Sequence, residues 1–85
     1  MTSNKSLNDR RVAATPRGVG VGTAIYADRA ENAEIWDVEG RRIIDFAGGI
    51  AVLNTGHRNP IVMDRVNEQL ARFTHTCYQV VPYAS

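Results

Sequence analysis

The chain has one cysteine, one lysine and almost no net charge. Cys77 is the only cysteine among 85 residues, so no disulfide can form within the chain, which excludes a disulfide-stabilised secreted scaffold. Ten basic and nine acidic side chains leave a net charge of +1, far below the basic footprint of a nucleic-acid binder. We therefore expect a reducing, cytoplasmic location and no nucleic-acid partner.

Long apolar runs are also missing. No run approaches the roughly 20 residues that a membrane-spanning helix needs, and the polar start at residues 1–5 lacks the apolar centre of a signal peptide. Arg10 and Arg11 could suggest a transit peptide, but Asp9 lies beside them and acidic residues are rare in such peptides. We expect neither a membrane partner nor organelle targeting.

What is present is the composition of a globular protein. Apolar residues make up 44% of the chain and charged residues 22%. A chain this short buries only roughly 60–65% of its unfolded surface, so its core should be thin. The pattern divides at a glycine-rich stretch, which predicts an N-terminal helix and connector over residues 1–22 and a folded unit, incomplete as a domain, over residues 23–85.

The first of these parts begins with a helix signal. Ser6 and Asp9 have the spacing of a capping box, and no helix-breaking residue follows until Pro16. Gly18, Gly20 and Gly22 then alternate with valines, which favours a flexible loop. A phosphate-binding loop is the alternative, but Thr23 stands where the dinucleotide fingerprint needs its third glycine, and no strand precedes it.

The middle of the chain predicts a β-meander. Three short segments are rich in isoleucine, valine and aromatic residues, at 23–28, 34–38 and 42–46. Residues 29–32 can turn the first segment into the second, and Glu39-Gly40 supplies a positive-φ position for a hairpin between the second and third. The expected product is a three-stranded antiparallel sheet.

An amphipathic helix should follow the meander. Asn59 is a good N-cap and Pro60 fits the first helical position, where its missing N–H costs nothing. Apolar residues then recur at helical spacing, at Val62, Met63, Val66, Leu70 and Phe73. Together with the meander, this helix places the chain in the α+β class.

His57, His75 and Cys77 are the strongest candidate metal ligands. They lack the paired spacing of a zinc site, so we expect no metal. His75 and Cys77 would share one face of a strand and could form a nucleophilic pair, but so short a chain offers no pocket for one. For His57, which precedes the Asn59-Pro60 helix start, the simplest interpretation is that it orders the helix entry by hydrogen bonding.

Residues 45–57 are the most distinctive stretch. Gly48, Gly49 and Gly56 allow close approach of backbone, whereas Ile50 and its apolar neighbours need burial. Taken alone, the stretch could be a packed loop. Its order of residue types is specific enough to compare with known families.

The chain resembles the opening of class III aminotransferases. The resemblance rests on WDVEG at 36–40, IDFAGGI at 44–50, NTGH at 54–57 followed by Pro60, and Thr74-His75-Thr76. Arg10-Arg11 and Pro16-Arg17-Gly18 further resemble the bacterial members that act on 4-aminobutyrate, 5-aminovalerate and related ω-amino acids. It covers nearly the whole chain.

This resemblance implies part of the small domain of a fold type I pyridoxal-phosphate-dependent transferase. By resemblance, Ile50 lines the substrate pocket and Gln79 lies near it. The implied reaction moves an amino group from the ω-carbon of a short amino acid to 2-oxoglutarate, and relatives are homo-oligomers. An apolar side chain at Ile50 suits an uncharged methylene chain, although Ile50 could also be a plain core residue.

The chemistry implied by the family is not carried by these residues. Pyridoxal phosphate needs a lysine for its Schiff base, an acidic partner for its ring nitrogen and a phosphate site. Lys5 is the only lysine and lies in the polar start of the chain. We therefore expect no catalytic or cofactor-binding residue here, and an inactive N-terminal portion of a longer enzyme; a stand-alone α+β interaction module is the alternative.

Overall fold

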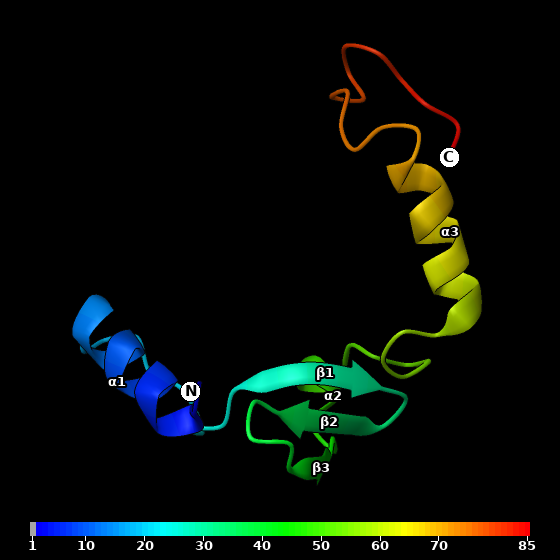
Figure 1. Ribbon diagram of the computed structural model, residues 1–85. Helices are drawn as coiled ribbons and strands as arrows, with labels where there is room; N and C mark the ends of the chain where they lie inside the picture. Colours follow the sequence, from blue (N-terminus) through cyan, green and yellow to red (C-terminus); the bar gives the residue numbers. More distant parts are fainter. Residues whose placement is uncertain (1) are drawn as a thin grey trace.

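The computed structural model describes residues 2–85 and shows a small sheet with a helix at either side (Figure 1). In chain order the elements are α1 (Asn4–Ala14), β1 (Ala27–Glu31), β2 (Glu34–Asp37), β3 (Arg42–Ile44), α2 (Gly48–Ala51) and α3 (Pro60–Leu70). This order matches the expected α+β arrangement of helix, meander and helix. The unexpected element is α2.

Helix α1 begins earlier than the sequence pattern suggested. Ser3 is its N-cap: the Ser6 N–H donates to Ser3 Oγ, and the Ser3 N–H donates to Ser6 Oγ, both at 3.1 Å. The predicted capping box of Ser6 and Asp9 is therefore wrong, because Ser6 closes the box instead of opening it. Asp9 forms an exposed ion pair with Lys5 at 2.7 Å.

The glycine-rich stretch after α1 is an exposed loop, as expected. A Cβ added at Gly18, Gly20 or Gly22 would meet no atom within 4 Å. The element before it is a helix rather than a strand, so the strand–loop–helix context of a dinucleotide site is missing. None of the helices within residues 2–85 has the length and apolar character needed to cross a membrane.

The three strands form the predicted antiparallel meander in the order β1-β2-β3. The prediction for strand β1 was misplaced, since it gave residues 23–28 and the strand covers Ala27–Glu31. The amides before it are bonded elsewhere: the Ile25 N–H donates to Thr23 Oγ1 and the Tyr26 N–H to Asn4 Oδ1. The turn between β1 and β2 therefore consists of Asn32 and Ala33, whereas residues 29–32 were expected.

The hairpin between β2 and β3 forms as predicted. Gly40 has φ +82°, and its N–H donates to the Asp37 carbonyl at 2.9 Å. Across the two strands, the Arg42 guanidinium binds the Glu34 carboxylate through two hydrogen bonds of 2.8 Å. A positive-φ glycine at this point is the residue that such a short loop requires.

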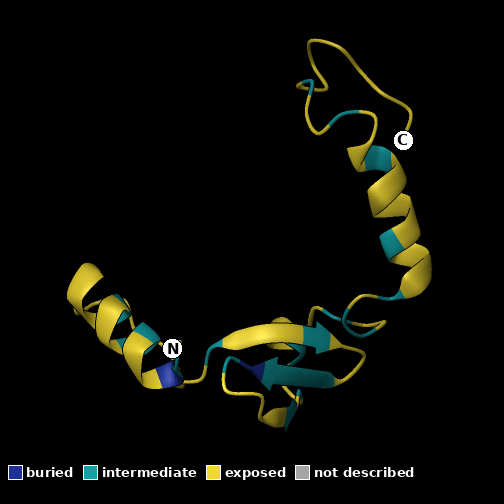
Figure 2. Ribbon diagram, in the orientation of Figure 1, coloured by how far each residue is buried: buried dark blue, intermediate teal, exposed yellow. Residues whose placement is uncertain are grey.

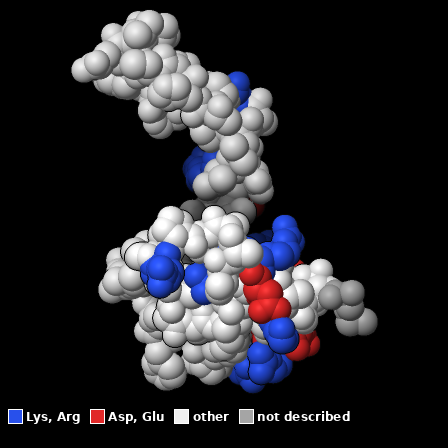
Figure 3. Space-filling model, turned by 90° about the vertical axis from the view of Figure 1, so that its left-hand side faces the viewer, with Lys and Arg blue, Asp and Glu red and all other residues white. Residues whose placement is uncertain are grey.

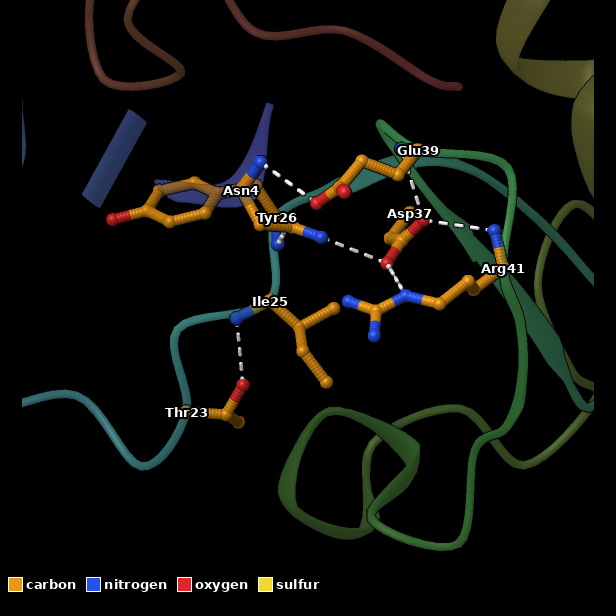
Figure 4. A network of polar contacts seen from close by, with 7 residues as sticks. All are labelled: Asn4, Thr23, Ile25, Tyr26, Asp37, Glu39 and Arg41. Atoms are coloured by element: carbon orange, nitrogen blue, oxygen red, sulfur yellow. Dashed lines mark hydrogen bonds and ion pairs between the residues drawn. The ribbon is translucent and has the colours of Figure 1, made fainter. Parts of the chain in front are cut away.

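A polar network joins α1 to the sheet (Figure 4). The Asp37 carboxylate accepts from Asn4 Nδ2 at 2.8 Å, from Arg41 Nε at 2.9 Å and from the N–H groups of Glu39 and Arg41. Asn4 and Asp37 are the buried polar residues of the described chain, at 6% and 2% exposure. Because both are fully bonded, the network fixes the start of α1 against the β2–β3 hairpin.

The ionisation of Asp37 gives a pH prediction. Burial alone would raise the pKa of Asp37, but the Arg41 N–H, the Asn4 amide, the Arg41 guanidinium and the Glu39 N–H together lower it from 3.8 to about 2. A lowered pKa means that the ionised group stabilises the folded chain above pH 3.8, and that this contribution is lost as the pH falls through about 2.

We expect the Asp37 carboxyl carbon to titrate near pH 2 by NMR, and the side-chain amide signal of Asn4 to shift with the same midpoint. In an Asp37→Asn variant, the Asn4 signal should lose this transition. Replacing the exposed Asp64 with asparagine is the matched control and should leave it in place. A midpoint near 3.8 would contradict the network.

Helix α3 begins where the sequence predicted. The Asn59 side chain accepts from the N–H groups of Ile61 and Val62, and Pro60 is the first helical residue. The helix ends at Leu70 rather than Phe73. Its predicted apolar face lies largely in solvent, with Val62, Val66 and Leu70 at 50%, 42% and 59% exposure.

Exposure of apolar side chains is general. No apolar side chain within residues 2–85 is buried, and Figure 2 shows yellow, exposed ribbon over most of both long helices. The radius of gyration is 17.2 Å, compared with roughly 12 Å for a compact domain of this length. On the face in Figure 3, basic side chains are scattered over a mainly uncharged surface, and the acidic ones lie beside basic ones at its right edge, so no large patch of one sign forms. The hydrogen bonds of the sheet and of the polar network, not a core, join α1 and the three strands.

Candidate functional site

The candidate site is the left-handed turn α2, which follows β3. Four successive residues have positive φ: Gly48 at 55°, Gly49 at 68°, Ile50 at 64° and Ala51 at 59°. The turn is closed by hydrogen bonds from the Ala51 N–H to the Ala47 carbonyl and from the Val52 N–H to the Gly48 carbonyl, at 3.0 and 2.9 Å. It is thus a short helical turn of the opposite hand to an ordinary α-helix.

Two of these residues adopt a backbone that their side chains disfavour. Glycine takes positive φ freely, but the left-handed region costs Ile50 and Ala51 roughly 1–2 kcal/mol each, and a β-branched residue there is rare. No local packing compensates, since the Ile50 side chain is 90% exposed. Backbone strain of this kind concentrates at functional sites, where it is held by surrounding structure.

Asp45 and His57 stand at the base of this turn. His57 Nε2 lies 2.7 Å from Asp45 Oδ2, and both side chains are largely shielded from solvent. The other oxygen of Asp45 accepts from the Gly48 N–H at 2.9 Å. The His57 ring and the Gly48 N–H lower the pKa of Asp45, so the carboxylate stays ionised beside the turn.

The structure refines the role predicted for His57. Its ring bonds to Asp45 rather than to the start of α3, which Asn59 caps. Its backbone forms an antiparallel bridge with Asn32, through hydrogen bonds of 2.8 and 3.0 Å. His57 therefore orders the segment before α3 by tying it to the β1–β2 turn and to Asp45.

The structure does not bring the two predicted substrate-binding residues together. Ile50 lies on α2 next to the sheet, whereas Gln79 lies in residues 74–85, which follow α3 at its far end (Figure 1). Gln79 is exposed in a turn closed by the Val80 and Val81 N–H groups on the Cys77 carbonyl. A shared pocket would have to be completed by other polypeptide.

The other candidate ligands are not assembled into a site. His75 and Cys77 were expected to share a strand face, but this segment forms a turn, and Cys77 is exposed with φ +55°. Over residues 2–85, no group of three or more histidine, cysteine, aspartate or glutamate side chains is placed to hold a metal ion.

Comparison with known proteins settles the family. The family model for aminotransferase class III matches residues 16–85. The chain belongs to the class III aminotransferases. Two relatives of this class III chain are each 60% identical to it: 4-aminobutyrate aminotransferase GabT of Escherichia coli, over 83 residues and 98% of the chain, and 5-aminovalerate aminotransferase DavT of Pseudomonas aeruginosa, over 81 residues and 95% of the chain.

Solved structures show the same fold for this class III chain. Acetylornithine aminotransferase from Elizabethkingia anophelis superposes on all of it with a TM-score of 0.86 at 22% identity. Ornithine delta-aminotransferase from Plasmodium falciparum covers 88% with a TM-score of 0.79 at 19% identity. The helix–meander–helix arrangement is thus a fragment of the pyridoxal-phosphate-dependent aminotransferase fold, as the sequence predicted.

The class III chain matches only part of these proteins. It spans about a fifth of each relative: 20% of GabT, 19% of DavT and 21% of the acetylornithine enzyme. These proteins therefore have about five times its length.

Proposed function

We propose that the chain forms the amino-terminal wall of the active site in a transaminase for ω-amino acids, which moves an amino group from 4-aminobutyrate or 5-aminovalerate to 2-oxoglutarate. The observation that carries the proposal is Ile50, an apolar side chain that is 90% exposed on a strained left-handed turn. No residue within the described chain buries that side chain. A pocket wall does, because a methylene chain needs an apolar surface beside it.

The similarity to GabT and DavT supports this choice of substrates. Their names describe donors with three or four methylene groups between the amino and carboxyl groups, which differ little along the part that an apolar wall would touch. We place Gln79 near the same pocket, as a polar group at its edge. A homo-oligomeric enzyme, as in the family, is part of the proposal.

The cofactor implied by the family is pyridoxal phosphate, and the residues of this chain do not fit it. The sole lysine, Lys5, lies on the exposed side of α1 with its Nζ 2.7 Å from Asp9. The glycine-rich loop, the one stretch that resembled a phosphate site, is exposed and follows a helix. We therefore assign the Schiff-base lysine, the acidic partner and the phosphate site to polypeptide outside these residues.

The test uses a chimera in which this chain replaces the matched segment of GabT. We expect the chimera to be active, and Ile50→Gln to lower kcat/KM for 4-aminobutyrate about 10- to 100-fold, because the buried amide would face methylene groups without a partner, at a cost of about 1–3 kcal/mol. The absorption spectrum of the bound cofactor should not change, since Ile50 is not proposed to contact it.

The matched control is Ile61→Gln, which makes the same exchange at an isoleucine that is 76% exposed on α3. Any effect of this control should fall on the thermal midpoint and not on kcat/KM. Equal kinetics for the Ile50→Gln and parent chimeras would show that Ile50 is an ordinary structural residue. An isolated 85-residue chain that is monomeric and unfolds cooperatively would instead favour the alternative, a stand-alone interaction module.

A further inference from the structure

The turn carrying Ile50 is closed by its own backbone hydrogen bonds, but no buried side chain stabilises it. Its side chains face solvent, with Phe46 before it 95% exposed and Ile50 90% exposed. The positive-φ conformations of Ile50 and Ala51 cost roughly 1–2 kcal/mol each. Polar contacts at the base of the turn are therefore the candidates for holding it.

Asp45 makes the decisive contact with the turn. Its Oδ1 accepts the N–H of Gly48, the first residue of α2, at 2.9 Å. This N–H is at the start of the turn and has no carbonyl partner within it. A carboxylate that accepts a backbone N–H forms a charge-assisted bond, which is about twice as strong as a neutral one. Asp45 thus fixes where the turn begins.

His57 in turn fixes Asp45. The ring Nε2 contacts Asp45 Oδ2 at 2.7 Å, on the oxygen that Gly48 does not use. The Asp45 and His57 side chains are 8% and 21% exposed, so water competes little for either group. A carboxylate held at both oxygens can rotate only by breaking one of the two contacts.

The position of His57 is itself determined by the sheet. Its N–H donates to the Asn32 carbonyl at 2.8 Å, and its carbonyl accepts the Asn32 N–H at 3.0 Å. Gly56 allows this approach, because a Cβ there would lie 3.0 Å from Asn32 Cα. A continuous series of contacts therefore runs from the β1–β2 turn through His57 and Asp45 to the turn that presents Ile50.

We propose that His57 and Asp45 are positioning residues for turnover of the donor: His57 orients the Asp45 carboxylate, which holds the left-handed turn and so places the Ile50 side chain against the donor. This inference rests on the proposed function of Ile50. Neither residue contacts the substrate in this scheme. Their effect on catalysis passes through Ile50.

A double-mutant cycle in the chimera tests this route. We expect His57→Ala to lower kcat/KM for 4-aminobutyrate about tenfold, because Ile50 then samples other positions. In an Ile50→Gly background the same substitution should change kcat/KM by less than about twofold, since there is no side chain left to position. His57→Gln should restore most of the activity, because the glutamine amide can donate to Asp45 from nearly the position of Nε2.

A second measurement does not depend on turnover. In the chimera, His57→Ala should speed hydrogen exchange at the Gly48 amide at least about tenfold, and His57→Gln should not. Equal effects of His57→Ala in the parent chimera and in the Ile50→Gly background would overturn the positioning role while leaving Ile50 as the pocket wall. No kinetic effect of Ile50→Gly would overturn both proposals.

Discussion

Purified alone and supplied with pyridoxal phosphate, 4-aminobutyrate and 2-oxoglutarate, the 85-residue chain should show no turnover beyond that of the cofactor free in solution. The reason is chemical as well as structural. Covalent catalysis by this cofactor needs a lysine activated in a shielded pocket, and Lys5 is exposed on α1 and paired with Asp9. With no apolar side chain buried within residues 2–85, the chain also offers no site that excludes water.

The measurement is a coupled assay of 2-oxoglutarate consumption, with the GabT chimera as the positive control. The turnover rate of the chimera should exceed that of the isolated chain by at least about 10⁴-fold, because enzymes accelerate reactions by about a million-fold or more. Turnover by the isolated chain that disappears in a Lys5→Arg variant would refute the assignment of the catalytic lysine to other polypeptide.

Replacing Gly56 with valine should strongly disrupt the candidate site. Gly56 has φ +78°, and an added Cβ would lie 3.0 Å from both Cα and the carbonyl oxygen of Asn32. Those atoms are backbone and cannot move away while the two hydrogen bonds between Asn32 and His57 remain. Strain and overlap together should cost about 3 kcal/mol, enough to open the bridge.

We expect the His57 amide in Gly56→Val to exchange about 100-fold faster, because about 1.4 kcal/mol corresponds to a factor of ten. The same substitution at Gly20 is the control, since Gly20 has ordinary φ and no neighbour within 4 Å of a new Cβ. In the chimera, Gly56→Val should also lower kcat/KM for 4-aminobutyrate. Exchange no faster than in Gly20→Val would show that the bridge tolerates a side chain.

Much of the fold was predictable because its signals are local. Asn59 and Pro60 define the start of α3 by adjacent residues, and Gly40 provides the positive φ that the β2–β3 hairpin needs. The strand order follows from short apolar segments separated by turn residues. These features depend on neighbours within a few positions, so a single sequence is enough to read them.

The predictions that failed concern features that depend on distant partners or on competing local hydrogen bonds. Strand β1 begins late because the Tyr26 N–H is taken by Asn4, which is 22 positions away. The buried contact between Asn4 and Asp37 has no signature in either segment. At α1, the expected capping box was Ser6 with Asp9. The actual capping box is formed one turn earlier, by Ser3 with Ser6, which have the same spacing.

The candidate site was predicted in composition but not in geometry. Residues 45–57 were singled out as the distinctive stretch, and His57 was expected to order the entry to the helix that follows it. The left-handed turn was missed, because Gly48 and Gly49 indicate positive φ but the following Ile50 and Ala51 argue against it. The polar contacts at the base of the turn, from the Gly48 N–H to Asp45 and from Asp45 to His57 12 positions away, have no signature in the sequence.

The hand of α2 has a consequence for stereochemistry. D-residues favour the left-handed turn as L-residues favour the right-handed one, so D-alanine at position 51 would adopt without strain the positive φ at which L-alanine is strained. Ribosomal synthesis cannot make that exchange, and glycine is the one genetically encoded residue without the penalty. The choice at Ile50 is therefore between a relaxed backbone with no side chain and an apolar surface with a strained backbone.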